Sequence, residues 1–260
     1  MSRFARWHID AAFYRAHPPR VTSLWAKIMP EAPEVTVRWD DGSGETMKAQ
    51  PGRTAFIDST QLYASLSEGD KAWVRHSRVR YAPSPYQWIQ DAKAAGNGFT
   101  MVSEGKEAAF EDLPSNDPEC IMEYPMVWPN PYTGELALSV HAIIATHLIK
   151  KTSADGPEEL IDDVSKVSTP FAPRGHPSRA DGRRPLQIRE ILYDLQRPFL
   201  RAENVLFSPQ QDGDMALWWN RGCRHTAVEY PSSYPDRWCH QVHVPGSDNP
   251  GAPQLVQQQA

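Results

Sequence analysis

Residues 212–238 read DGDMALWWNRGCRHTAVEYPSSYPDRW, and this stretch is the most informative one about the fold. It contains His225 and, twelve residues later, Arg237. The segments MALWWN and TAVEY, and WCHQVHV just beyond, are rich in β-branched and aromatic residues, which is typical of strands. We therefore expect His225 and Arg237 each to lie directly before or within a strand.

A second informative stretch lies almost at the front of the chain. Residues 6–14 read RWHIDAAFY and place His8 two residues before Asp10. With nine His and seventeen Asp in 260 residues, about one such pair is expected by chance. On its own, the pair could be an exposed pair near a frayed end of the chain.

Together the two stretches resemble the iron(II)/2-oxoglutarate dioxygenases of the taurine dioxygenase (TauD/TfdA) type. That family combines a His-x-Asp pair with a Gly-Asp-x-x-x-W-x-N-R-x-x-x-His segment, which residues 213–225 match, and an Arg shortly after it. Within that family the chain resembles the fungal xanthine dioxygenases, through WHIDAAFY, NPYTGEL, LQRP and the spacing from His225 to RWCHQ. The resemblance covers most of residues 7–245.

The resemblance implies that His8, Asp10 and His225 bind Fe(II). Two imidazoles and one carboxylate on one face of the iron leave three coordination positions open. Residues 8 and 10 of a strand point to the same side, so a His-x-Asp pair can address one metal. His8 and His225 are far apart in the sequence, and a jelly-roll is a fold that brings such segments together.

The resemblance also implies a site for the cosubstrate 2-oxoglutarate. Arg237 would bind its distal carboxylate, a charge-assisted contact that contributes about 1.5–3 kcal/mol. Thr54, in PGRTAF, would add a hydroxyl. The plain alternatives are a surface salt bridge for Arg237, a strand hydroxyl for Thr54 and a hydrogen-bonded strand histidine for His225.

Two residues are candidates for the substrate pocket. Gln241, four residues after Arg237, matches a Gln that in xanthine dioxygenases lies against the purine. His243 stands where we expect Asn in those enzymes, and a neutral His offers its donor and acceptor in a different geometry. Xanthine or another purine is the first substrate that we expect, and another fungal metabolite is the second.

Other aromatic residues have a plain interpretation first. Trp128, Trp218 and Trp219 could line a pocket, but strand tryptophans are more often part of a core. His141 is expected in the core or behind the metal ligands. Arg221, beside Asn220, is expected to be a structural ion-pair partner and not a ligand.

Composition restricts the class of protein. A net charge of −5 and a pI near 6.0 argue against a nucleic-acid partner, and no apolar run is long enough for a membrane span or a signal peptide. The three cysteines lack C-x-x-C spacing, so free thiols in a reducing compartment are expected. We therefore expect a soluble, cytoplasmic protein whose partners are a small-molecule substrate and O₂. The sequence leaves its oligomeric state open.

Local patterns predict several elements. Residues 35–39 (VTVRW) followed by DDGSG indicate a strand and a hairpin turn, with a second strand near AFI at 55–57. Ser67 and Asp70 form a capping box for a helix that we expect to continue through KAWVRHSRV. LALSV at 136–140 indicates a buried strand.

The second half of the chain contains a polar stretch. Residues 152–184 are rich in Pro, Gly and Ser, so we expect a surface insertion without regular structure. Pro185 suits the first turn of a helix that ends before Pro198 and packs on a sheet. The apolar residues of this helix share one face: Ile188, Ile191, Leu192 and Leu195.

These observations predict a mainly β protein with flanking helices, a double-stranded β-helix (jelly-roll), in one domain over residues 1–245 with a disordered tail at 246–260. The family normally has a substantial segment ahead of its His-x-Asp pair, and only seven residues precede His8 here. We therefore expect a jelly-roll truncated at its N-terminus, with an exposed strand edge.

The predicted function is that of an Fe(II)- and 2-oxoglutarate-dependent dioxygenase that hydroxylates a small molecule and releases succinate and CO₂. One alternative is a catalytically impaired, truncated remnant, which would bind metal poorly and release no succinate. The other is a zinc-dependent hydrolase, because His, His and Asp also suit zinc. Such a hydrolase would have no evident need for Arg237.

Overall fold

The computed structural model describes residues 2–10, 17–39, 41–102, 106–113, 122–162 and 187–253. The strands are β1 (Val21–Ile28), β2 (Val35–Arg38), β3 (Thr46–Ala49), β4 (Thr54–Asp58), β5 (Arg78–Tyr81), β6 (Glu123–Pro125), β7 (Val127–Pro129), β8 (Leu136–Leu138), β9 (Ala145–Lys150), β10 (Glu159–Asp162), β11 (Leu206–Phe207), β12 (Met215–Trp219), β13 (Cys223–Ala227) and β14 (Trp238–Val244). The α-helices are α1 (Ser59–Ser65), α2 (Glu68–Val74), α3 (Pro85–Trp88) and α4 (Gln187–Gln196), and short 3-10 turns include Asn220–Gly222.

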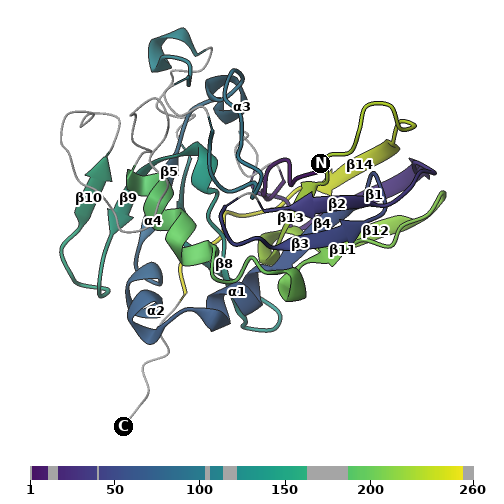
Figure 1. Cartoon of the computed structure of the whole chain (residues 1–260). Coiled ribbons are helices and arrows are strands. Elements are labelled where there is room, and N and C mark those ends of the chain that lie inside the picture. Colours follow the sequence, from purple (N-terminus) through teal and green to yellow (C-terminus); the bar gives the residue numbers. More distant parts are fainter. Residues whose placement is uncertain are drawn as a thin grey trace.

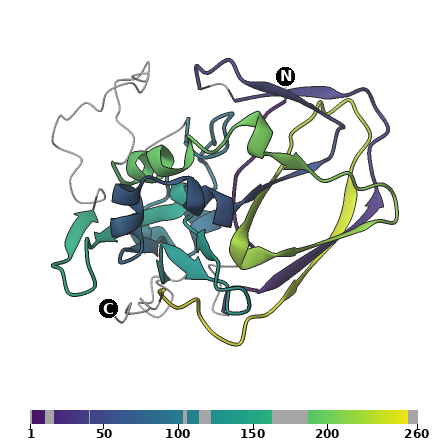
Figure 2. The ribbon, with the colours of Figure 1, turned by 90° about the horizontal axis from the view of Figure 1, so that it is seen from below.

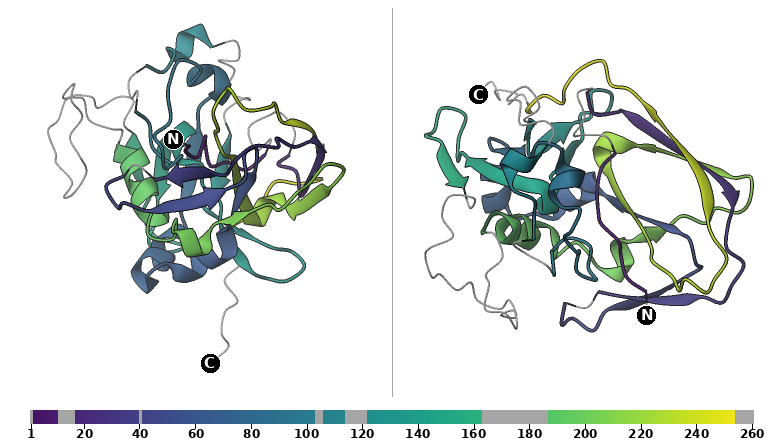
Figure 3. Two further views of the ribbon diagram at one scale, coloured as in Figure 1. Left: turned by 45° about the vertical axis from the view of Figure 1, so that its right-hand side comes forward. Right: turned by 90° about the horizontal axis from the view of Figure 1, so that it is seen from above.

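One half of the molecule consists of strands that enclose a common interior, on the right of Figure 1. The sheet β12-β1-β14 lies across from the sheet β11-β4-β13, and the hairpin β2-β3 lies beside them. The two sheets meet through aromatic side chains, since the ring centroids of Phe56 on β4 and Trp218 on β12 are 5.1 Å apart. Figures 2 and 3 show from below and from above how the chain runs around this interior.

The other half is an antiparallel sheet covered by helices. Its strand order is β10-β9-β5-β6, and α4 packs against β9. The apolar face of α4 supplies Ile188, Leu192 and Leu195 to the core, with Ile191 partly buried beside them. The predicted helix that ends before Pro198 and packs on a sheet is therefore confirmed.

The amino-terminal segment runs along β13 without forming a continuous strand. Phe4 and His8 make single antiparallel bridges, to Val228 and His225. Between these bridges the backbone N–H of Arg6 donates to the Thr226 hydroxyl at 2.8 Å instead of to a backbone carbonyl. The ladder is therefore interrupted, and the strand assumed for the His-x-Asp pair is reduced to one bridge.

Most strands that the sequence predicts are present. The strand at 35–39 corresponds to β2, AFI lies in β4, LALSV contains β8, and MALWWN and WCHQVHV correspond to β12 and β14. Gly42 and Gly44 between β2 and β3 adopt positive φ, as the hairpin prediction requires. The strand expected at TAVEY begins three residues earlier, at Cys223.

Two predicted boundaries were wrong. The helix capped by Ser67, whose Oγ accepts from the Asp70 N–H at 3.0 Å, ends at Val74 and does not continue through KAWVRHSRV. Residues Arg78–Tyr81 form β5 because RVRY alternates and pairs with β6 and β9 on both sides. Part of the insertion at 152–184 is also regular, since Glu159–Asp162 pairs with β9 as β10.

The carboxyl-terminal region differs from the expected disordered tail in its described part. Asp248 accepts from Arg20 at 2.8 Å and lies 3.4 Å from Arg221, and Pro250 is buried. These contacts hold residues 246–253 against the body of the molecule. The rest of the tail, most of the insertion, Pro185 and Cys120 lie outside the described residues. No helix in the described ranges is both long and apolar enough to cross a membrane.

Candidate metal and cosubstrate site

The backbone brings the two predicted histidine ligands together. His8 and His225 form a reciprocal pair in which each N–H donates to the other's carbonyl at 3.0 Å. Their side chains leave the same side of this pair, and the ring centroids are 4.3 Å apart. Residues far apart in the sequence thus become neighbours through one antiparallel bridge.

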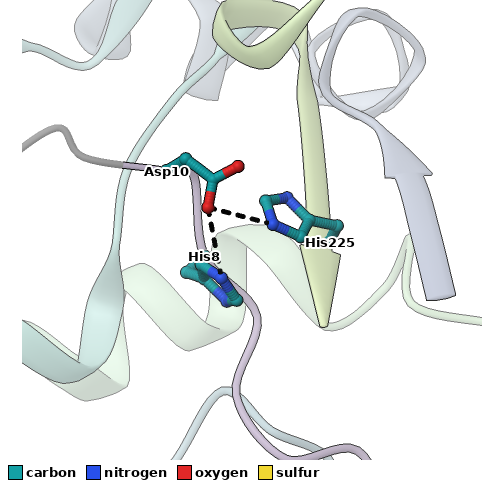
Figure 4. A group of neighbouring side chains, drawn as sticks. All are labelled: His8, Asp10 and His225. Carbon is teal, nitrogen blue, oxygen red and sulfur yellow. Dashed lines mark ion pairs between the residues drawn. The ribbon is translucent and has the colours of Figure 1, made fainter. Parts of the chain in front are cut away.

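Asp10 completes the cluster that Figure 4 shows. Its Oδ1 lies 3.3 Å from Nε2 of His225 and 3.8 Å from Nε2 of His8. Ligand atoms about 2.1 Å from a metal and at right angles to each other lie about 3 Å apart. The three donor atoms therefore have nearly the spacing that one metal ion requires, and all lie within 4.8 Å of one another.

The unused polar atoms of this cluster fit a bound cation. Oδ2 of Asp10 and both ring nitrogens of His225 are buried and have no hydrogen-bond partner among the described residues. Buried polar atoms without partners are costly and are rare in folded proteins. His8 donates from Nδ1 to the carbonyl of Arg6 at 2.8 Å when Nδ1 carries the proton, which leaves the Nε2 lone pair facing Asp10.

The charge states suit metal binding. Burial, with a smaller contribution from His225, lowers the pKa of His8 to about 4, so its ring is neutral at pH 7. Burial acts to raise the pKa of Asp10, but its contacts with His225 and His8 outweigh that effect and hold the pKa below its usual value. A neutral imidazole and a carboxylate are the forms that coordinate metals.

Asn220 is a supporting residue whose role the sequence did not reveal. Its side-chain Oδ1 accepts from the backbone N–H of Asp10 at 2.9 Å, and its Nδ2 donates to the carbonyls of Asp10 and Pro19, both at 3.1 Å. Asn220 is completely buried. It therefore fixes the backbone of the carboxylate ligand, and only its place in the NRG segment gave a signal.

The predicted cosubstrate residues also meet. Arg237 lies just before β14 and Thr54 begins β4, and Nη2 of Arg237 donates to Oγ1 of Thr54 at 3.0 Å. The Nε of Arg237 donates to Sγ of Cys239 at 3.0 Å, and its backbone N–H donates to the Tyr230 hydroxyl at 3.0 Å. Two side-chain contacts thus orient the guanidinium without neutralising its charge.

The two candidate substrate residues approach Asp10 from β14. Gln241 donates from Nε2 to Oδ1 of Asp10 at 2.8 Å. Nδ1 of His243 lies 3.8 Å from Oδ2 of Asp10 and 3.3 Å from the hydroxyl of Thr22 on β1. Strand β1 is a positioning element that the sequence did not predict, because its pairing with β12 and β14 is long-range.

Aromatic residues surround the histidine ligand on β13. The ring of Trp218 packs edge-on against His225 at 4.8 Å, and Phe56 stacks on it at 5.9 Å. Trp128 is a core residue instead, 2% exposed, with Nε1 donating to the carbonyl of Pro125. Trp219 contacts Tyr132 on the far side of β12. Of the three tryptophans, Trp218 alone contacts a candidate ligand.

The remaining predictions concern structural residues. Arg221 donates to the carbonyl of Pro18 at 2.7 Å and pairs with Asp248, so its structural role is confirmed. His141 is 2% exposed and lies in the core, close enough to His8 for the two rings to influence each other. Cys223 and Cys239 are free thiols, as expected.

Comparison with known proteins identifies relatives along almost the whole chain. It is 35% identical to the alpha-ketoglutarate-dependent dioxygenase bsc9 of Alternaria brassicicola over 98% of this chain and 60% of that protein. It is 38% identical to the alpha-ketoglutarate-dependent xanthine dioxygenase xan-1 of Neurospora crassa over 97% of this chain and 55% of that protein, and 40% identical to xanA of Emericella nidulans over 87% and 54%. The chain thus spans less than two thirds of the length of these relatives.

Solved structures agree on the fold. AAD-2 in complex with Mn(II) and N-oxalylglycine superposes with a TM-score of 0.57 at 16% identity, covering 95% of this chain and 71% of that one. A putative alpha-ketoglutarate dependent 2,4-D dioxygenase from Burkholderia xenovorans gives 0.54 at 17% identity, covering 93% and 67%. The mainly β fold with few helices is therefore that of TauD-type dioxygenases, a jelly-roll. Because the profile of the "Taurine catabolism dioxygenase TauD, TfdA family" also matches residues 1–243, the chain belongs to this family.

Proposed function

We propose that this protein is an Fe(II)- and 2-oxoglutarate-dependent dioxygenase that hydroxylates a small organic molecule. The observation that supports it most strongly is the cluster of His8, Asp10 and His225, in which Oδ2 of Asp10 and both ring nitrogens of His225 are buried without partners among the described residues. The polar pair of Arg237 and Thr54, from the strands of the same half, supports a second ligand beside the metal. Relatives named as alpha-ketoglutarate-dependent dioxygenases agree with this assignment.

Each residue has a defined task in this proposal. His8, Asp10 and His225 hold the iron on one face, and the bound iron supplies the open positions at which the keto acid and O₂ react. Arg237 binds the carboxylate of 2-oxoglutarate that is remote from the metal, and Thr54 orients Arg237 and donates its own hydroxyl. One substrate C–H, one O₂ and one 2-oxoglutarate yield the alcohol, succinate and CO₂.

The proposed substrate is xanthine or another purine, with a fungal metabolite as the second choice. Gln241 and His243 extend toward the metal ligands from β14 and would read the polar edge of such a ring. The relatives named xanthine dioxygenases favour the purine, whereas bsc9 and fc-dox of Phomopsis amygdali carry only the general dioxygenase name.

The experiment that tests the proposal measures succinate and CO₂ from purified protein with Fe(II), ascorbate, 2-oxoglutarate and a panel of purines. We expect succinate to form in a one-to-one ratio with a hydroxylated product, and Arg237→Gln to raise the KM for 2-oxoglutarate at least about tenfold. If a purine is the substrate, His243→Asn should change the KM for the purine and leave the KM for 2-oxoglutarate unchanged.

The two alternatives give different results in the same assay. A catalytically impaired remnant would release no succinate with any substrate, even when the metal is bound. A zinc hydrolase would act with Zn²⁺ and would not require 2-oxoglutarate. The truncation expected from the sequence stays a prediction, and the measured activity of this chain would decide whether it has a functional cost.

A further inference from the structure

A second arginine lies beside the predicted cosubstrate residues. Arg53 immediately precedes Thr54, and its backbone carbonyl accepts from the N–H of Val228. The preceding Gly52 has a positive φ, and a Cβ there would meet Pro30 at 2.7 Å and lie 3.5 Å from Cβ of Arg237. The backbone just before Arg53 and Thr54 therefore packs closely beside Arg237.

Neither arginine is neutralised by a residue that the structure describes. No ion pair between described residues includes Arg53 or Arg237, and Nη1 of Arg53 is buried without a hydrogen-bond partner among them. A buried charged donor without a partner is costly, so such a group is retained where something else satisfies it. The unsatisfied group here is an N–H of a guanidinium, which requires an acceptor.

The surrounding charges do not supply that acceptor. Asp214 is the carboxylate whose charge Arg53 experiences, but its Oδ2 accepts from the backbone N–H of Gln211 at 2.8 Å within a turn. Burial, and next the positive charge of Arg237, lower the pKa of Arg53 below its usual value. The two guanidinium groups therefore repel each other in the free protein, and an anion between them would relieve this repulsion.

We propose that Arg53 is a further binding residue of this site, forming with Arg237 and Thr54 a pocket for the carboxylate of the cosubstrate that is remote from the metal. The inference rests on the proposed function, because it takes 2-oxoglutarate as the ligand. It goes beyond the single arginine and the threonine that the family pattern matches. Two guanidinium groups and a hydroxyl hold a carboxylate from several directions, which favours a dicarboxylate over a keto acid with one carboxylate.

Equilibrium binding tests this role without turnover. Protein loaded with Mn(II) is titrated by calorimetry with N-oxalylglycine, and then with N-methyloxamate, which lacks the second carboxylate. We expect Arg53→Gln to lower the affinity for N-oxalylglycine at least about tenfold and to leave the affinity for N-methyloxamate unchanged. Arg53→Lys should recover part of the lost affinity. Arg38 is an exposed arginine on β2, so the control variant Arg38→Gln should bind both ligands as the wild type does.

Urea unfolding of the ligand-free variants separates binding from structure. Because Arg53 has no ion-pair partner in the described part of the chain, Arg53→Gln should be at least as stable as the wild type without ligand and should gain less stability from N-oxalylglycine. Equal affinity of wild type and Arg53→Gln for N-oxalylglycine, with Arg237→Gln weakened, would overturn the role of Arg53 alone. Failure of the wild type to bind N-oxalylglycine would overturn both this inference and the proposed function.

Discussion

Two sets of arginines, one in each half of the molecule, have opposite surroundings. In the helix-covered half Arg78 and Arg80 share Glu123, and Arg189 pairs with Glu107 at 2.5 Å. In the strand half, the positive charge of Arg237 acts on Arg53, and neither arginine has a carboxylate partner in an ion pair among the described residues. The first group holds the chain together, whereas the second keeps its positive charge available for an anion. Arginine thus serves stability in the first set and, in our proposal, anion binding in the second.

The histidine cluster extends this contrast and carries the largest predicted effect. His225→Ala removes a metal-ligating ring nitrogen that has no hydrogen-bond partner in the described structure. Metal-dependent turnover should therefore be lost, and metal affinity should fall more than about 100-fold. The free energy of unfolding of the metal-free protein should change little. Metal titration and urea unfolding of the same preparation check both statements. A variant that binds metal as tightly as the wild type would remove His225 from the site.

A change in the helix-covered half should have the reverse effect. Arg189 is 1% exposed and donates to Glu107 and to the carbonyl of Ile143, so Arg189→Met removes the ion-pair partner of a largely buried carboxylate. We expect a loss of about 3–5 kcal/mol in the free energy of unfolding. The affinity of the protein that remains folded for Mn(II) and N-oxalylglycine should be unchanged. A ligand affinity that falls in step with stability would argue against a division between the two halves.

Asn220→Ala tests how the strand half supports its ligands. Loss of its two hydrogen bonds to the backbone of Asp10, and of a third to the carbonyl of Pro19, should weaken metal binding about 10–100-fold. Asn220→Asp is the matched control, because it keeps the acceptor for the Asp10 N–H but loses both donors, and it should bind metal with intermediate affinity. If the two variants bind metal equally well, the contact between Asn220 and the Asp10 N–H has no role in positioning Asp10.

The pH dependence of stability gives the smallest predicted effect. The pKa of His8 is about 4 in the folded protein and about 6.5 when unfolded, so the unfolded state binds more protons between these values. The contribution of His8 to stability is complete above pH 6.5 and is lost as the pH falls toward 4. At pH 5 this loss amounts to about 2 kcal/mol of the free energy of unfolding. His141, whose burial lowers its pKa well below the usual value, acts in the same direction.

Urea unfolding of metal-free protein at pH 7.5, 6.5 and 5.5 checks this dependence. His141→Gln should lose less stability than the wild type over this range, because one of the two titrating groups is absent. Equal losses in both proteins would show that His141 does not titrate as its burial predicts.

The sequence predicted those features that depend on local pattern or on motif. Strands β2, β4, β8, β12 and β14, helix α4 and the capping Ser67 follow from alternation, turns and caps. The approach of His8, Asp10 and His225 followed from the family pattern. Features that depend on long-range contacts were missed: β1 is positioned by pairing with β12 and β14, and β10 is an edge strand that pairs with β9.

The same reason explains the residues of the site that the sequence did not reveal. Asn220 acts on the backbone of Asp10 across 210 positions. The proposed role of Arg53 depends on Nη1 having no partner among the residues that the structure describes, which no sequence pattern can express. The helix expected to continue past Val74 ends early because RVRY pairs as a strand with β6 and β9. Local propensity yields where tertiary pairing satisfies the backbone better.

The most direct test of the central claim is an anaerobic titration of the purified protein with Fe(II) and 2-oxoglutarate, followed by visible absorption. Chelation of the keto acid by iron in the site should produce a weak charge-transfer band that saturates with one equivalent of each ligand. The band should be absent in His225→Ala and should require much higher 2-oxoglutarate in Arg237→Gln. A folded, metal-loaded wild-type protein that gives no band would contradict the account, because the cluster of His8, Asp10 and His225 would then not be the site of a 2-oxoglutarate-dependent dioxygenase.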